Sequence, residues 1–181
     1  MREPGPAVGY QADMYTYAEA GPVRRVVRQV VTSRPVAWMS ARYLPAVDRV
    51  ALRWTRGRWL PSRWVTGLPV VRLTTVGARS GALRTSPVLG IPAGEGLVVL
   101  AANFGQARNP AWYHNLRAHP RVTVTAGSGV REFDAVELEG EERERWFAEA
   151  LRLNPGWRRF RTRAGARGIP VVRLEPARRR G

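Results

Sequence analysis

The chain has 181 residues, 44% of them hydrophobic, and this size and composition fit one globular domain rather than a disordered chain. Thirty basic residues, all of them arginine, stand against 14 acidic ones, and the formal net charge of +16 favours polyanionic partners. The lack of cysteine excludes disulfides, thiolate metal ligands and cysteine nucleophiles.

Residues 1–67 carry two helical patterns. Valines between residues 23 and 31, and apolar residues between 47 and 54, recur at the spacing of one helix face. Arginine and tryptophan alternate over 53–64. We predict an N-terminal helical extension that covers the domain. The alternative is an amphipathic surface in peripheral contact with an anionic membrane.

The period changes to that of strands from residue 68 onward. Aliphatic and β-branched runs between glycine- and proline-containing turns predict strands at 69–76, 86–91 and 97–102. A short helix is expected next, with Asn109 as its N-cap and Pro110 as its first residue. The remaining predictions are a hairpin of 121–126 and 131–138, a helix at 140–153, a loop or broken helix at 153–165, and a strand at 169–176.

This order of elements does not alternate as a βαβ series. It predicts an α+β domain over residues 68–176, in which an antiparallel sheet forms a small barrel and the helices pack outside it. Residues 177–181 are expected to be a basic tail. We found no secretory signal and no apolar run of membrane-spanning length, so a cytoplasmic location is expected.

Several chemistries lack the residues they need. His114 and His119 are the two histidines, and neither forms a metal-binding or triad pattern with a nearby carboxylate, so no metal site is predicted. The chain also lacks a GxGxxG fingerprint and a P-loop. These absences leave anion binding by loops as the chemistry to consider.

Two glycine-containing loops carry the pattern of an anion site. In GARSGALRTSP, Gly77 and Gly81 permit a tight turn, while Arg79 and Arg84 supply charge. A solvated hairpin with incidental arginines explains this stretch about equally well. The loop NFGQARN leads into a helix N-terminus, which attracts anions, and Trp112 in its first turn is suited either to packing on a flat ring or to the core.

Three segments together resemble the deazaflavin (F420)-dependent nitroreductase family of actinobacteria. They are LTTVGARSGALRTSP, VVLAANFGQARNPAWYHNLRAHPRVTV, and the ending NPGWRRF with IPVVRLEP, and they span residues 68–176. The resemblance implies a split β-barrel of about six strands that binds coenzyme F420. It also implies hydride transfer from reduced F420 to an electron-poor small molecule such as a quinone, an enone or a nitro compound.

The resemblance also implies where the cofactor binds, in four stretches of this sequence. The predicted cofactor contacts are Ala78, Arg79 and Ser80; Arg84, Thr85, Ser86, Pro87, Val88 and Leu89; Leu100, Ala101, Ala102 and Asn103; and Ala111, Trp112, Tyr113, His114 and Asn115. The family's late loop, which lines the substrate side, falls on Asn154, Trp157 and Phe160.

The sequence departs from the best-known nitroreductase at informative positions. Ala102 and Asn103 stand where that enzyme has a serine and a lysine, and Trp157 and Phe160 replace tyrosines, so nitro reduction is less expected than F420 binding. The alternatives are an FMN-binding split barrel and a basic nucleic-acid-binding protein, although no specific nucleic-acid motif is present. A homodimer is a further expectation for this fold.

Overall fold

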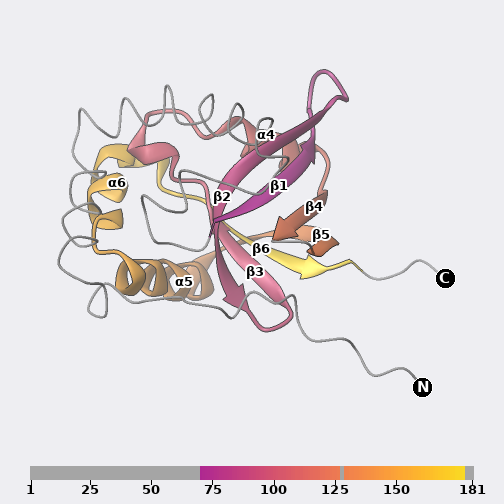
Figure 1. Cartoon of the computed structure of the whole chain (residues 1–181). Coiled ribbons are helices and arrows are strands. Elements are labelled where there is room, and N and C mark those ends of the chain that lie inside the picture. The colour runs from indigo at the N-terminus through magenta and orange to yellow at the C-terminus, as the bar shows by residue number, and fades with distance from the viewer. Residues whose placement is uncertain (1–69, 127–128, 178–181) are drawn as a thin grey trace, which may run out of the picture.

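Six segments rich in aliphatic and β-branched residues form strands in the computed structural model, which describes residues 70–126 and 129–177. They are β1 (Val70–Val76), β2 (Leu83–Ala93), β3 (Gly96–Leu100), β4 (Arg121–Ala126), β5 (Gly129–Leu138) and β6 (Val171–Pro176). All neighbouring pairs are antiparallel, and the order β1-β2-β3-β6-β5-β4 closes because β4 also pairs with β1. The predicted antiparallel barrel is confirmed (Figure 1).

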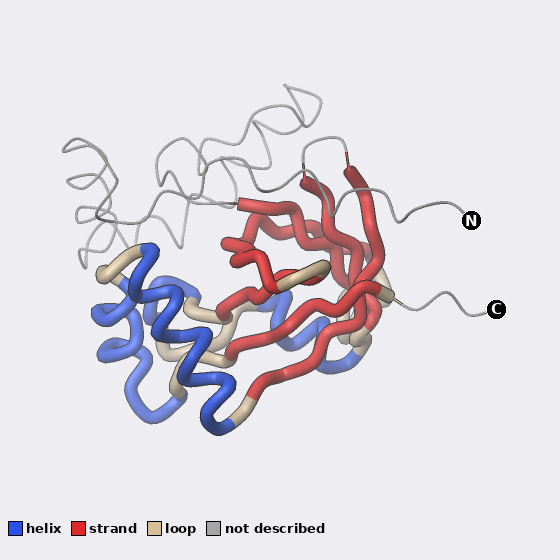
Figure 2. Tube along the Cα trace, turned by 90° about the horizontal axis from the view of Figure 1, so that it is seen from below, coloured by secondary structure: helices blue, strands red, loops and turns tan. Residues whose placement is uncertain are grey.

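Three α-helices pack on this barrel within the described ranges: α4 (Ala111–Ala118), α5 (Gly140–Leu153) and α6 (Trp157–Ala164). Figures 1 and 2 show α5 and α6 together on one side of the barrel, while the β1–β2 hairpin projects away from them. Their apolar faces bury Phe147 and Leu153 of α5 and Phe160 of α6 against strand residues. A second buried cluster fills the space between the strands and α4.

Strand β2 begins earlier than the predicted residue 86, so Arg84 and Thr85 lie in a strand rather than in a loop. They pair with Thr75 and Thr74 of β1, and the Thr74 and Thr85 hydroxyls form a 2.8 Å hydrogen bond. Pro87 fits within this strand because β3 pairs only with Gly90–Ala93, so the missing N–H of Pro87 faces no partner strand on that side.

One other prediction about local structure needs correction. The prediction that Asn109 caps the helix is wrong, since α4 begins at Ala111, and Pro110, with extended backbone angles, is its N-cap. The segment predicted as a loop or broken helix follows the second alternative, since α6 is separated from α5 by Asn154–Gly156. Trp157, Phe160 and Ala164 of α6 are buried at helical spacing, and this burial favours a helix despite the arginines between them.

The predicted helical extension at 1–67, its arginine- and tryptophan-rich stretch, and most of the basic tail lie outside the described residues. The two domain boundaries therefore stay predictions. In the ranges that the structure describes, no helix is both long and apolar enough to cross a membrane.

Candidate cofactor site

The first predicted stretch forms the turn of the β1–β2 hairpin. Gly77 N–H donates to Ala82 O, and Gly81 N–H donates to Gly77 O, each at 2.9 Å. Gly81 has φ of +64°, which a residue without Cβ adopts at little steric cost. Arg79 and Ser80 are exposed at the turn. The glycines thus form the tight turn that the sequence predicts, with an arginine at its tip.

Asn115 of α4 joins three of the four predicted stretches. Its side-chain oxygen accepts a 3.0 Å hydrogen bond from Ala78 N–H, and its side-chain nitrogen donates to Thr75 Oγ1 at 3.0 Å. Thr75 Oγ1 in turn donates to Arg84 O at 3.4 Å. A chain of polar contacts therefore runs from α4 to the turn and to the start of β2. Because Asn115 and Thr75 are buried, water competes little with these bonds.

The stretch Arg84–Leu89 divides between the two faces of the hairpin. Residues opposite each other on antiparallel strands share a face, so Arg84 and Ser86 lie on the same face as the buried Thr75 and Leu73. Side chains alternate along a strand, which places Thr85, Pro87 and Leu89 on the other face. The side chains of Arg84, Ser86 and Val88 therefore lie on one face of the hairpin, and those of Thr85, Pro87 and Leu89 lie on the opposite face.

The third stretch ends β3 and enters an unusual turn. Leu100, Ala101 and Ala102 are buried, and a short 3₁₀ segment follows at Asn103–Gly105. Asn103 and Phe104 have φ of +45° and +54°, and Gly105 has φ of +77°. Asn tolerates this left-handed region better than Phe does, so the turn has a backbone cost that its surroundings must offset.

An arginine that the sequence analysis missed holds this turn. Arg167 donates from Nη1 to Ala101 O at 3.1 Å and from Nη2 to Ala102 O at 3.0 Å, and Nη1 also donates to Asn109 Oδ1. In an arginine-rich chain nothing in the sequence distinguishes Arg167 from its neighbours, because the contact joins segments more than 55 residues apart.

The fourth stretch, in α4, is partly core. Ala111 and His114 are exposed, whereas Trp112 and Tyr113 are buried, with Trp112 in the apolar cluster that includes Val88 and Ala101. The Tyr113 hydroxyl donates to the Glu137 carboxylate, at 2.8 Å to the nearer oxygen. Burial, followed by the hydrogen bond to Glu137, raises the pKa of Tyr113, so this phenol stays protonated at neutral pH.

The residues predicted for the substrate side lie close to the third stretch. The Phe160 ring packs edge-on against Phe104, with centroids 5.9 Å apart, and against Trp157 at the same separation. All three predicted residues are buried, with 6% of Trp157, 7% of Phe160 and 7% of Asn154 exposed. Asn154 Oδ1 accepts a 2.9 Å hydrogen bond from Gly156 N–H and so shapes the link between α5 and α6.

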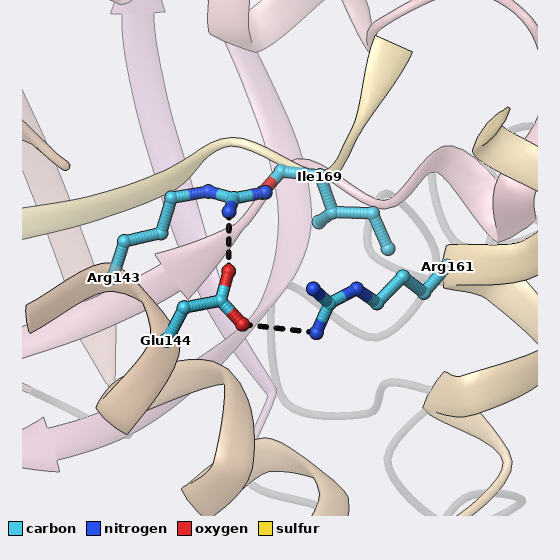
Figure 3. Close-up of polar contacts among 4 residues, drawn as sticks. All are labelled: Arg143, Glu144, Arg161 and Ile169. Atoms are coloured by element: carbon cyan, nitrogen blue, oxygen red, sulfur yellow. Dashed lines mark hydrogen bonds and ion pairs between the residues drawn. The ribbon is translucent and has the colours of Figure 1, made fainter. Parts of the chain in front are cut away.

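Polar contacts fix α6 beside this turn (Figure 3). Glu144 of α5 accepts from Arg143 Nη1 at 2.5 Å and from Arg161 Nη1 of α6 at 3.0 Å. Arg143 Nη2 also donates to Ile169 O at 3.2 Å, and the Arg161 guanidinium lies 4.8 Å from the centre of the Phe147 ring. These contacts join α5, α6 and the segment before β6 into one support for the Phe160 side.

Charge is divided along the described chain in a way that suits a polyanion. Residues 70–131 contain one acidic residue, Glu95, whereas nine acidic residues lie between 132 and 177. In the part of the chain that the structure describes, Arg79 and Arg84 have no ion-pair partner. Unpaired guanidinium groups on a hairpin whose own residues, 70–93, include no carboxylate are the donor chemistry that phosphate and carboxylate groups require.

Comparison with known proteins identifies the family. Residues 50–176 match the model of the F420H(2)-dependent quinone reductase family. The chain belongs to this family. A Mycobacterium tuberculosis protein named "Putative F420H(2)-dependent quinone reductase" is 31% identical over 109 residues, which cover 60% of this chain and 91% of that protein. A second M. tuberculosis F420H(2)-dependent quinone reductase is 36% identical over 59 residues, covering 33% of this chain and 40% of that protein.

Solved structures agree with this assignment. An F420-H2 dependent reductase, FDR-A, matches with a TM-score of 0.54 and 37% identity over 59% of this chain and 94% of that one. A structure described as a domain-swapped dimer matches with a TM-score of 0.56 and 32% identity, covering 78% of this chain and all of that one. Membership in the F420H(2)-dependent quinone reductase family confirms the predicted family, the split-barrel fold, the F420 cofactor and reductase activity.

Within the described ranges no group of three or more potential metal ligands occurs. F420 rather than FMN is the cofactor that the family assignment supports. The individual contact residues in the four stretches stay predictions.

Proposed function

We propose that this member of the quinone reductase family reduces quinones with F420H2 bound at the β1–β2 hairpin and the turn after β3. The observation that carries the proposal is the pair of unpaired arginines, Arg79 and Arg84, on a hairpin that Asn115 ties to α4. A phosphate and an oligoglutamate tail bring several negative charges to one region, and a hairpin with free guanidinium groups and no acidic residue of its own suits their binding.

The remaining contacts follow from the placement of the other stretches. Arg79 at the tip of the hairpin and Arg84 on β2 bind the phosphate and the tail. The backbone at 87–88 and at 101–103 forms the surface against which the planar ring lies. Val88, Ala101 and Trp112 share one buried cluster, and this supports a rigid and apolar floor for that ring.

The substrate side lies toward α6. Phe160 packs on Phe104, which follows Asn103 in the chain. A flat electrophile stacked on the deazaflavin ring would therefore lie close to these two phenylalanines. The Trp157 ring packs edge-on against Phe160, and the buried Asn154 shapes the link that leads into α6. Quinones are the favoured class because the family and its curated members are named for them. Enones and nitro compounds are alternative substrates, because they are electron-poor like quinones.

When bound, reduced F420 supplies a hydride, and reduction of a quinone to a hydroquinone then takes one further proton. None of the predicted contact residues is a carboxylic acid. Tyr113 is the phenol closest to the site along α4, but its hydroxyl is committed to Glu137 and its pKa is raised. The proton therefore comes from water, and the protein contributes binding, orientation and electrostatics.

A fluorescence titration of the purified protein with F420 tests the cofactor site. The wild-type protein should bind at micromolar concentrations, and Arg84→Ala should bind more weakly because a charged contact to the anion is removed. Arg145→Ala is the matched control, since Arg145 is an exposed arginine of α5 whose ion pair with Glu142 spans 3.8 Å. Equal F420 affinities for Arg84→Ala and Arg145→Ala would refute the assigned position of the tail. If the wild-type protein does not bind F420, the proposed function is refuted.

A homodimer is part of the proposal, supported by the similar structure that is described as a domain-swapped dimer. Light scattering on the purified chain distinguishes a dimer from a monomer. Peripheral contact with the inner face of the plasma membrane stays a prediction because the segment that would make it lies outside the described residues. The expectation that the protein binds no specific nucleic acid also stays a prediction.

A further inference from the structure

Arg167 contacts the turn after β3 at three acceptors and makes no other polar contact among the described residues. Its guanidinium donates to Ala101 O, Ala102 O and Asn109 Oδ1, which lie at the start and the end of the loop between β3 and α4. One rigid fork thus spans the loop and fixes the distance between its ends, which a flexible ammonium group does less well.

The charge of Arg167 is not neutralised by a carboxylate in the described part of the chain. Its Nε is buried and has no hydrogen-bond partner there. Desolvation lowers the pKa of the guanidinium, although an arginine retains its charge at physiological pH. Burial of a cation without a carboxylate partner costs free energy, which its three hydrogen bonds must offset.

The two carbonyl contacts set the direction of two peptide N–H groups. In a planar trans peptide, the C=O and the following N–H point in opposite directions. Because Arg167 holds Ala101 O and Ala102 O, the N–H groups of Ala102 and Asn103 point away from Arg167. Among the described residues, neither of these N–H groups donates a hydrogen bond. The loop therefore presents two adjacent donors on its far side.

The same loop has backbone angles that residues other than glycine adopt only at a cost. Asn103, Phe104 and Gly105 are three consecutive residues in the left-handed region. Gly105 fits closely against α6, where an added Cβ would lie 2.9 Å from Phe160 O. α6 supports one end of the turn. Its beginning is held by Arg167 together with two backbone hydrogen bonds, from Ala101 N–H to Pro170 O at 2.9 Å and from Gly105 N–H to Ala102 O at 2.8 Å.

We propose that Arg167 is a positioning residue of the cofactor site, which orients the Ala102 and Asn103 N–H groups as a donor pair for an electron-rich acceptor of the bound cofactor. A carbonyl that accepts from a cation polarises its peptide, and this makes the opposite N–H a stronger donor. The inference rests on the proposed function, since it takes the turn after β3 as a surface that faces F420.

Two variants of Arg167 and one control test the proposal. Arg167→Lys keeps the charge but loses the fork, and Arg167→Met loses both. Arg173→Lys is the matched control, because Arg173 also uses several guanidinium N–H groups, toward Glu142 and Glu175, but does not contact the loop or α6. F420 affinity is measured by fluorescence titration, and thermal stability is measured on the same samples.

Arg167→Lys should raise the Kd for F420 roughly tenfold, with a larger increase for Arg167→Met, while Arg173→Lys leaves the Kd unchanged at a comparable loss of thermal stability. Equal Kd values for Arg167→Lys and Arg173→Lys would overturn the proposal. If the Arg167 variants do not fold, amide exchange of the wild-type protein decides: saturating F420 should slow exchange at Ala102 and Asn103, and unchanged exchange there would overturn the inference. Failure of wild type to bind F420 would overturn the proposed function with it.

Discussion

Asn115 offers the most direct test of how the site is assembled. Its side chain is 9% exposed, and it connects α4 to the hairpin through Ala78 N–H and Thr75 Oγ1, each at 3.0 Å. Replacing Asn115 by alanine removes both contacts without adding bulk. The hairpin that carries Arg79 and Arg84 then loses its polar link to the helix.

The size of the effect follows from which groups can reach water. Thr75 is 1% exposed, so its hydroxyl loses a donor that water does not replace, and this costs about 1–3 kcal/mol. Ala78 is exposed, so its N–H recovers a hydrogen bond to water and adds roughly 0.5–1 kcal/mol. We therefore expect Asn115→Ala to lower the free energy of unfolding by about 2–3 kcal/mol.

Urea unfolding of Asn115→Ala, Thr75→Val and the double variant measures this value and its coupling. The two single changes remove the same hydrogen bond, so their effects should fall short of additivity by about 1 kcal/mol. His114→Ala, an exposed position on the same helix, is the control and should change stability by less than about 0.5 kcal/mol. Additive single effects, or a loss for Asn115→Ala no larger than that of the control, would refute the assigned link.

Gly105→Ala should destabilise the fold by more than about 2 kcal/mol, since it adds a Cβ at φ of +77° against Phe160. Gly94→Ala, at φ of +62° with open space around it, should cost only about 1 kcal/mol, and thermal melts that rank the two equally would contradict the packing. The raised pKa of Tyr113 contributes stability that is complete below the unfolded value of about 10 and is lost as pH rises through the folded value. The free energy of unfolding, measured with urea across this range, should therefore fall more steeply with pH for wild type than for Tyr113→Phe; parallel curves would contradict a raised pKa for Tyr113.

The fold was predictable where the sequence repeats a local pattern. The hairpin at 121–138 and helix α5 follow from alternation and from helical spacing, and the structure places both close to the expected bounds. The start of β2 was missed because Leu83–Thr85 lack a strand-like run and become a strand by pairing with Thr74–Val76. Helix α6 was obscured by arginines, since its helical conformation depends on burying three residues against a neighbouring turn.

The loops of the site were predictable from the sequence, whereas the long-range hydrogen bonds that hold these loops were not. Gly77, Gly81 and Arg79 predicted a tight basic turn, and the structure has it. The contacts of Asn115 with residues 37 and 40 positions earlier, and those of Arg167 with residues 65 and 66 positions earlier, leave no trace in local sequence. Such bonds depend on the closed order of strands, which only the folded chain brings together.

The central claim is tested most directly by anaerobic mixing of reduced F420, a water-soluble naphthoquinone and catalytic amounts of the full chain. The account predicts protein-dependent return of the visible absorbance of oxidised F420, saturable in F420H2, with a higher KM for Arg84→Ala than for Arg145→Ala. If oxidation of F420H2 by the quinone proceeds no faster with the protein than without it, the account is contradicted.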